Sequence, residues 1–190
     1  IAIPVLKVVL LWGWRHLFFI YPAFIMIALY GFVSLFNYFQ SKIANAKIKI
    51  LKVLLSLITI LALSIPTFFM IKNHPYQNVY FNFLAGKNME EIKNKFDVSY
   101  WGLSYREALE YILKYDDSKS IKVFTTTYPG KINTYILNKN ERDRLVFVNS
   151  IDETKYFISD YRWHEKGFPY NEFYSIKVDG GKIMVVYKLK

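Results

Sequence analysis

The first 89 residues of this 190-residue chain contain no Asp or Glu, and Glu90 is the first acid. The chain also has no cysteine, which excludes disulfide bonds and thiolate metal sites. Residues 1–89 hold eight Lys and Arg, whereas residues 90–190 hold 17 basic and 15 acidic residues. The basic excess therefore belongs to the amino-terminal part. This placement indicates membrane lipid as a partner and argues against nucleic acid.

Two long apolar runs, 17–39 and 53–71, carry no charge. A helix needs roughly 20 apolar residues to cross a hydrocarbon core about 30 Å thick. Both runs can span, and the second extends to 50–71 if Lys52 snorkels to the interface. The alternative is a pair of buried core helices, although soluble helices of this length normally show a polar face.

Residues 1–11 form a third apolar segment that is too short to span and contains Lys7. A signal peptide would place its charges first and end at a small-residue cleavage site, and this segment does neither. We interpret it as a partial span, the end of an earlier membrane segment. The chain is then expected to be the carboxyl-terminal part of a larger membrane protein, with residues 1–72 as its transmembrane region.

The connector at 40–52 contains Lys42, Lys47, Lys49 and Lys52, whereas only Arg15 and Lys72 lie near the opposite ends of the two spans. The positive-inside rule places such a Lys-rich loop in the cytoplasm. We therefore expect an integral protein of a bacterial inner or plasma membrane. Its region 73–190 would lie on the extracytoplasmic side.

Residues 73–190 predict a small α/β domain with a carboxyl-terminal β-hairpin. Apolar spacing predicts helices at 89–96 and 104–115, and Pro129 predicts the start of another at 129–136. Strands are expected at 121–126, 145–148, 155–161, 172–178 and 182–189, with Asp179-Gly180-Gly181 as the hairpin turn. This order favours a sheet with some parallel pairing and an antiparallel edge. Ser104 and Glu107 are expected to form a capping box.

Trp14, Arg15 and His16 open the first complete span. A cationic pair beside Trp at the membrane interface can bind a phosphate and stack on a lipid or a sugar. The plainer interpretation is an interfacial anchor, because Trp and Arg are ordinary residues at the ends of membrane helices.

A second polar and aromatic segment, 73–82, follows the last span. Its candidate ligand-binding residues are His74, Tyr76, Asn78, Tyr80 and Asn82. They could face a polyprenyl-phosphate headgroup or a sugar at the outer surface. Alternatively the segment is a rigid exit loop, because Pro75 restricts the residue before it and Tyr side chains prefer headgroup level.

Two further segments combine polar and aromatic residues. Residues 97–102 could be a carbohydrate-stacking platform or a cap in which Trp101 seals the domain on the membrane. Residues 160–164 form a polar loop that ends in His164, a lone imidazole without a surrounding metal pattern. We identify no catalytic residue, no metal site and no cofactor motif in the sequence.

Four segments carry a family resemblance. They are residues 13–22, GWRHLFFIYP; residues 74–82, HPYQNVYFN; residues 100–109, YWGLSYREAL; and residues 174–180, YSIKVDG. In this order they resemble the carboxyl-terminal part of bacterial polytopic glycosyltransferases of the superfamily that includes the dolichyl-phosphate-mannose–protein mannosyltransferases and the aminoarabinose lipid A transferases.

The resemblance implies transfer of a sugar from a polyprenyl-phosphate donor to an extracytoplasmic acceptor. In that superfamily the catalytic acid lies in the first outer loop, so it is expected upstream of Ile1 and the chain alone is expected to be inactive. Arg15 and His16 become candidates for the donor phosphate, and residues 74–82 for the substrate-facing rim. The alternative is a non-enzymatic two-span protein with an extracytoplasmic binding domain.

Overall fold

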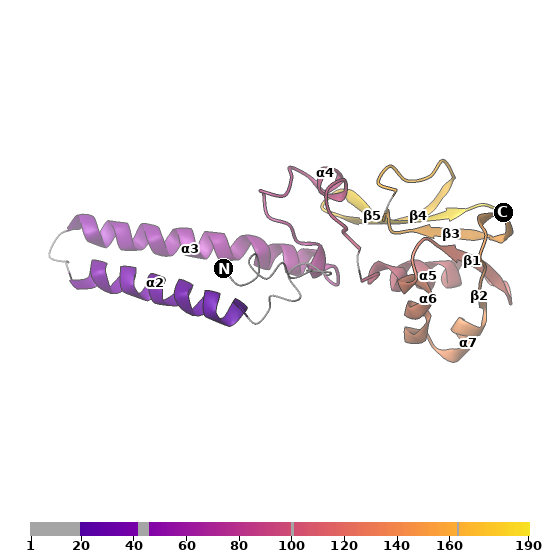
Figure 1. Cartoon of the computed structure of the whole chain (residues 1–190), viewed down its shortest axis with the longest axis horizontal. Coiled ribbons are helices and arrows are strands. Elements are labelled where there is room, and N and C mark those ends of the chain that lie inside the picture. Colours follow the sequence, from indigo (N-terminus) through magenta and orange to yellow (C-terminus); the bar gives the residue numbers. More distant parts are fainter. Residues whose placement is uncertain (1–19, 42–45, 100, 163) are drawn as a thin grey trace, which may run out of the picture. The chain divides into compact units, whose positions relative to one another are not determined.

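The computed structural model describes residues 20–41, 46–99, 101–162 and 164–190 (Figure 1). The chain divides into two compact units, Ile1–Ser64 and Ile65–Lys190. Helix α2 (Tyr21–Ser41) and most of helix α3 (Ala46–Lys72) belong to the first unit, and the last two turns of α3 belong to the second.

Both helices contain a stretch that is long and apolar enough to cross a membrane, Tyr21–Tyr38 in α2 and Val53–Lys72 in α3. None of the first stretch and 6% of the second is buried within the chain. A core helix of a soluble protein would be mostly buried, so these helices fit the membrane interpretation by length, composition and exposure. The prediction of two candidate spans is confirmed, and the partial segment 1–11 lies outside the described residues.

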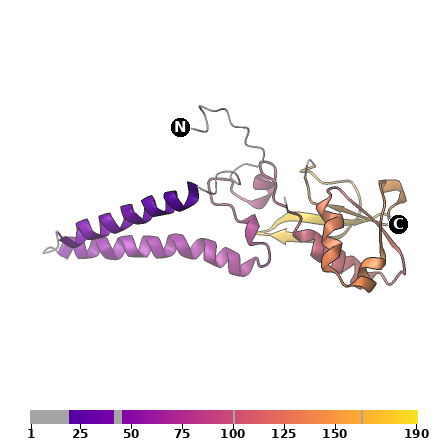
Figure 2. The same ribbon diagram turned by 60° about the horizontal axis from the view of Figure 1, so that its bottom comes forward.

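The second unit is a small α/β domain. Segment 73–88 runs from the end of α3 to the first domain helix as irregular chain with one 3₁₀ turn (Figure 2). The helical elements that follow α3 are η2 (Gln77–Val79), α4 (Met89–Lys93), α5 (Ser104–Tyr115), α6 (Pro129–Ile132), η3 (Asn133–Ile136), α7 (Lys139–Asp143) and η4 (Ile151–Glu153). The strands are β1 (Ile121–Thr125), β2 (Leu145–Phe147), β3 (Tyr156–Ser159), β4 (Glu172–Val178) and β5 (Gly181–Lys188).

These strands form one five-stranded sheet in the order β2-β1-β3-β5-β4. β1 pairs in parallel with both β2 and β3, whereas β5 pairs antiparallel with β3 and β4. The edge strand β2 has only three residues, and the register of β4 against β5 shifts twice, between Glu172 and Tyr174 and between Ile176 and Lys177. The predicted mixed sheet with a closing hairpin is therefore confirmed.

Helix α5 covers one face of the sheet (Figure 1). Tyr105, Leu109 and Ile112 on this helix are fully buried, as the helical spacing of the apolar residues predicts. The opposite face carries a smaller cluster of Phe157, Tyr161, Val185 and Tyr187, against which Phe168 packs. Because both faces are covered, all four residues of β3 are buried.

The expected capping box at the start of α5 is wrong. Leu103 occupies the cap position and no side chain caps the helix there. Ser104 is instead the first helical residue, and its hydroxyl lies 2.7 Å from the hydroxyl of Ser99. In a capping box the Glu107 carboxylate would accept the backbone N–H of the cap residue. Here it accepts the hydroxyls of Tyr76 and Tyr174 instead.

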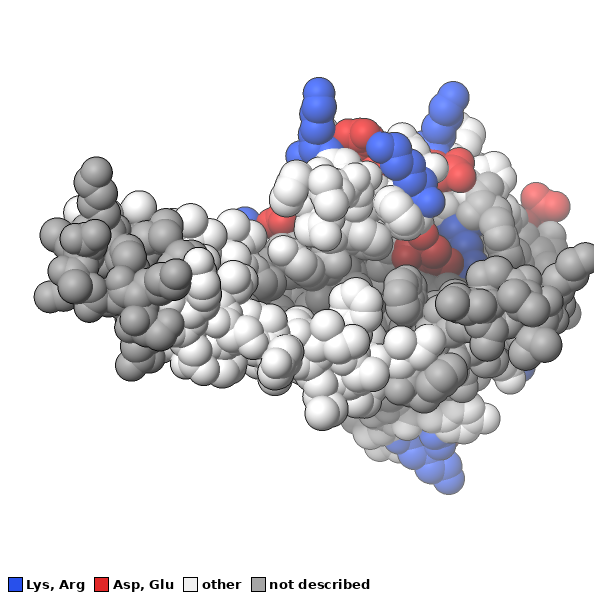
Figure 3. Space-filling view, turned by 60° about the vertical axis from the view of Figure 1, so that its left-hand side comes forward, with Lys and Arg blue, Asp and Glu red and all other residues white. Residues whose placement is uncertain are grey.

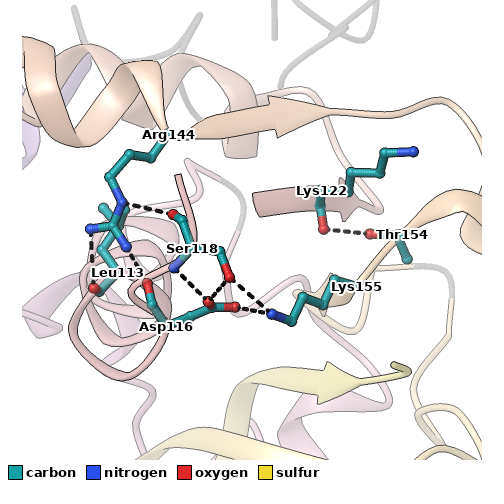
Figure 4. Close-up of polar contacts among 7 residues, drawn as sticks. All are labelled: Leu113, Asp116, Ser118, Lys122, Arg144, Thr154 and Lys155. Carbon is teal, nitrogen blue, oxygen red and sulfur yellow. Dashed lines mark hydrogen bonds and ion pairs between the residues drawn. The ribbon is translucent and has the colours of Figure 1, made fainter. Parts of the chain in front are cut away.

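A polar cluster closes the sheet at the amino ends of the three parallel strands (Figure 4). Arg144 donates to the carbonyl oxygens of Leu113, Asp116 and Ser118. These hydrogen bonds satisfy carbonyl groups in the last turn of α5 and in the chain directly after it. The Asp116 carboxylate accepts from the Ser118 hydroxyl at 2.6 Å and pairs with Lys155 Nζ at 2.7 Å. These contacts join the end of α5 to the starts of β1, β2 and β3.

The Asp116 contacts make the stability of the domain depend on pH. Burial alone would raise the pKa of this carboxyl, but the hydrogen bonds from Lys155 and Ser118 outweigh burial and hold the pKa well below its ordinary value of 3.8. A lowered pKa in the folded state stabilises the domain above about pH 4, and this stabilisation is lost as pH falls through the folded-state pKa. At pH 7, Asp116→Asn should lower the free energy of unfolding by about 2 kcal/mol.

Urea unfolding of the detergent-solubilised chain between pH 7 and pH 2 measures this effect. The difference between the wild type and Asp116→Asn should shrink below pH 4. Asp117→Asn is the matched control, because Asp117 is the exposed neighbouring acid and should leave the unfolding midpoint unchanged. An equal loss in both variants would contradict the assignment to Asp116.

Candidate functional site

The eight candidate residues from the sequence fall into two groups. Trp14, Arg15 and His16 lie outside the described residues, so their role stays a prediction. The other five lie in segment 73–82, which follows α3 directly. Their side chains do not converge on one point.

His74 and Asn78 lie on the outside of this segment. The His74 Nδ1 atom is 2.5 Å from Gln77 Nε2, so the imidazole and the amide face each other across the turn that precedes η2. The exposed imidazole and amides give the segment a polar rim that can meet a ligand from solvent. This arrangement fits the predicted rim but does not test it.

Tyr76, Tyr80 and Asn82 have internal partners. The Tyr76 hydroxyl donates to Glu107 Oε2, and this side chain is buried. The Tyr80 ring stands edge-on to the ring of Phe69 with centroids 5.1 Å apart. Asn82 Oδ1 accepts the backbone N–H of Leu84 at 3.1 Å. These three residues therefore fix the path of the segment.

Glu107 joins three separate parts of the chain. Its Oε1 accepts the Tyr174 hydroxyl from β4 at 2.5 Å, and its Oε2 accepts the Tyr76 hydroxyl. The Tyr174 ring also stacks on Tyr111 of α5, with centroids 3.7 Å apart and planes 10° apart. Burial, and then the Glu107 carboxylate, raises the pKa of both Tyr76 and Tyr174 far above the ordinary range. Both phenols therefore remain protonated donors, and Glu107 is held as their acceptor.

A second carboxylate lies where the parallel strands end. Thr126 and Thr127 follow β1, and Asp160 follows β3, so parallel pairing brings them to the same edge of the sheet. Asp160 accepts the hydroxyls of Thr126 at 2.9 Å and Thr127 at 2.6 Å. The hydroxyl of Tyr105 lies 2.9 Å from that of Thr127, which extends this network to α5. In open α/β sheets ligands bind outside this carboxyl edge.

A groove of about 390 Å³ opens at this edge, and we call it the edge groove. It is lined by Lys93, Asn94, Lys95, Phe96, Asp97, Val98, Asp160, Tyr161, Arg162 and Glu165. Arg162 Nε lies 3.0 Å from Asp97 Oδ2, so residues 97 and 162 meet here although 65 positions separate them in the chain. Burial raises the pKa of Asp97 despite the opposing effect of Arg162.

The edge groove presents paired charges and an aromatic ring. Lys93 Nζ is 2.5 Å from Glu90 Oε2 and lies 4.1 Å from the centroid of the Tyr161 ring. Figure 3 shows basic and acidic side chains interspersed on the upper part of the face in view. Neutralised pairs of this kind offer hydrogen-bond donors and acceptors to hydroxyl-rich ligands without a strong net charge. Among the described residues no group of three or more His, Asp or Glu could hold a metal ion.

The sequence missed Glu107 and Asp160 as organising residues. Glu107 appeared only as half of a capping box, since its partners Tyr76 and Tyr174 lie 31 and 67 positions away. Asp160 had a weak signal, because a run of threonines at 125–127 ends one predicted strand and Asp160 ends another. Finding the pair required the knowledge that β1 and β3 are neighbours.

No protein-family model, no curated protein and no solved structure matches this chain. The functional argument therefore depends on the residues themselves.

Proposed function

We propose that the chain is the carboxyl-terminal part of a membrane glycosyltransferase that transfers a sugar from a polyprenyl-phosphate donor to an extracytoplasmic acceptor. The observation that carries the proposal is the junction at Glu107. The family resemblance comes from four segments, and three of them each contribute one residue to this junction. They are segments 74–82, 100–109 and 174–180. The three segments thus contact one another at Glu107, which supports the proposal that they act together as one element.

In this proposal the soluble domain shapes access to the acceptor. Glu107 and its two tyrosine donors hold segment 73–82 against α5 and β4, so the polar rim at His74 and Asn78 has a fixed position. Preorganised side chains of this kind orient a substrate at low entropic cost. Arg15, His16 and Trp14 would contact the donor phosphate, and the catalytic acid would come from the parent protein upstream.

The topology belongs to the same proposal. The two candidate spans and the Lys-rich connector 40–52 support a cytoplasmic connector and an extracytoplasmic domain. Polyprenyl-phosphate sugars that face outward would then be on the same side as the domain.

Arg15→Ala tests the donor-phosphate role in membrane vesicles that contain the intact parent protein. Loss of one charge-assisted contact with phosphate should lower transfer of radiolabelled sugar at subsaturating donor about tenfold, mainly through a higher KM for the donor. Lys42→Ala is the matched control, because this basic residue lies in the predicted cytoplasmic connector. Equal activity of Arg15→Ala and the wild type would contradict the phosphate role.

The second candidate function is a membrane-anchored binding domain without transferase activity. The edge groove favours this alternative, since it offers paired charges and Tyr161 to a hydroxyl-rich ligand away from segment 73–82. A parent protein that transfers no sugar from any polyprenyl-phosphate donor, yet retains envelope polysaccharide on a column, would favour the binding domain over the enzyme.

A further inference from the structure

The tight turn at 82–86, which we call the Phe83 turn, exposes two large apolar side chains. Phe83 is 86% exposed and Leu84 is 79% exposed, the highest values among the exposed large apolar residues that the structure describes. The turn is fixed by two hydrogen bonds, from Leu84 N–H to Asn82 Oδ1 at 3.1 Å and from Ala85 N–H to Asn82 O at 3.0 Å. The apolar pair is therefore held outward by the backbone.

The Phe83 turn lies beside the last turns of α3. A groove of about 480 Å³ is lined by residues from both, including Phe69 of α3 and Phe81, Asn82 and Phe83. Phe69 is buried against Tyr80, whereas its neighbours Phe68 and Ile71 are 68% and 74% exposed. One side of the helix end thus contacts Tyr80 and faces the groove beside the turn, whereas Phe68 and Ile71 remain exposed.

The part of α3 beside the Phe83 turn indicates how deep the turn would lie relative to a membrane boundary. Lys72 ends the helix and pairs with Asp179 at 3.2 Å, so the polar boundary lies near Lys72. Phe69 precedes Lys72 by three residues, which is about 4.5 Å along a helix axis. Side chains that bind at a membrane interface reach about 5–10 Å into the boundary between headgroups and acyl chains. Because Phe69 and Phe83 line the same groove, the Phe83 turn lies close to this part of α3.

The charge around the turn is compatible with lipid. Segment 73–89 itself contains no acid, and its one Lys or Arg is Lys87, directly after the turn. Two acids lie close in space, since Glu91 Oε2 accepts the Lys87 N–H at 2.9 Å and Asp179 lines the groove beside the turn. Both are paired with lysines, Glu91 with Lys95 at 2.6 Å and Asp179 with Lys72 at 3.2 Å. A lysine next to exposed apolar residues can bind a lipid phosphate while Phe and Leu enter the apolar region.

From these observations we infer that the Phe83 turn is a membrane-docking element. Phe83 and Leu84 insert into the lipid leaflet in which the carboxyl-terminal end of α3 terminates, and Lys87 lies at the headgroups. The domain is then attached to the bilayer at two points, the helix α3 and this turn. The inference concerns only lipid contact and goes beyond the proposed sugar transfer.

The absence of cysteine allows a direct test, because a single introduced cysteine can be labelled alone. Phe83→Cys and Leu84→Cys, each carrying an environment-sensitive NBD dye, are reconstituted into vesicles of phosphatidylcholine and phosphatidylglycerol. Lipids with a nitroxide near the top of the acyl chain serve as quenchers in both leaflets. Tyr135→Cys is the matched control, since Tyr135 is also apolar, 74% exposed and on the same unit.

We expect dye at positions 83 and 84 to lose most of its emission with nitroxide lipid, while dye at position 135 retains it. Quenching at 83 and 84 no stronger than at 135 would overturn the inference. Protection of both positions from aqueous iodide without lipid quenching would also overturn it, because protein would then cover the turn. Urea unfolding of each labelled variant verifies its fold, and none of these outcomes depends on transferase activity.

Discussion

Replacing Gly102 by alanine should destabilise the soluble domain by roughly 4 kcal/mol. Gly102 has a φ of +65°, a left-handed conformation that costs an alanine about 1–2 kcal/mol. An added Cβ would also lie 2.5 Å from the Cβ of Pro129 and 2.9 Å from Cδ2 of Tyr105. Overpacking of this kind costs about 1–3 kcal/mol more, because Pro129 and the fully buried Tyr105 have little room to move.

Urea unfolding of the detergent-solubilised chain, monitored by circular dichroism, measures this loss. Gly180→Ala separates the two causes, since Gly180 has a φ of +81° but no atom within 4 Å of an added Cβ. The control should lose only about 1–2 kcal/mol. Similar losses in both variants would show that the contacts with Pro129 and Tyr105 contribute nothing.

Tyr105→Ala should cost about 3–5 kcal/mol, the range for removal of a large aromatic side chain from a core. Tyr105 is fully buried between α5 and the sheet, and its hydroxyl lies 2.9 Å from the Thr127 hydroxyl. Tyr105→Phe keeps the ring and removes only this hydroxyl, so it should cost about 1 kcal/mol. The same unfolding experiment gives both values.

The comparison of these two variants tests how much the hydrogen bond between Tyr105 and Thr127, next to Asp160, contributes to the stability of the domain. If Tyr105→Phe loses as much stability as Tyr105→Ala, the hydroxyl contact with Thr127 dominates and the packing argument is wrong. If the ring dominates, as we expect, Asp160 keeps its two threonine donors in Tyr105→Phe, and the edge groove retains its shape.

Much of the fold could be predicted because its elements have local signals. Helix α5 occupies the predicted 104–115, since its apolar residues recur at helical spacing. The hairpin β4–β5 forms around Asp179 and Gly180, both of which have positive φ, as the turn residues indicated. The two candidate spans follow from length and apolar composition alone.

Other features had only a weak local signal or depend on contacts between distant residues. The short helix α7 is capped by Asn138, which accepts the N–H of Glu141 at 3.0 Å, but its sequence has no apolar stripe. Glu107 and Asp160 acquire their partners only when strands and helices assemble. Of the candidate residues, Tyr76 is the one that the structure connects to Glu107, and Trp14, Arg15 and His16 lie outside the described residues.

The two border strands of the sheet have a consequence for solubility at high concentration. An exposed, flat border strand is a template on which other chains can add strands and aggregate. Here β2 is only three residues long, and β4 is made irregular by two register shifts. Neither border offers a long regular row of backbone donors and acceptors, so crowded copies of the domain have little opportunity to polymerise through their sheets.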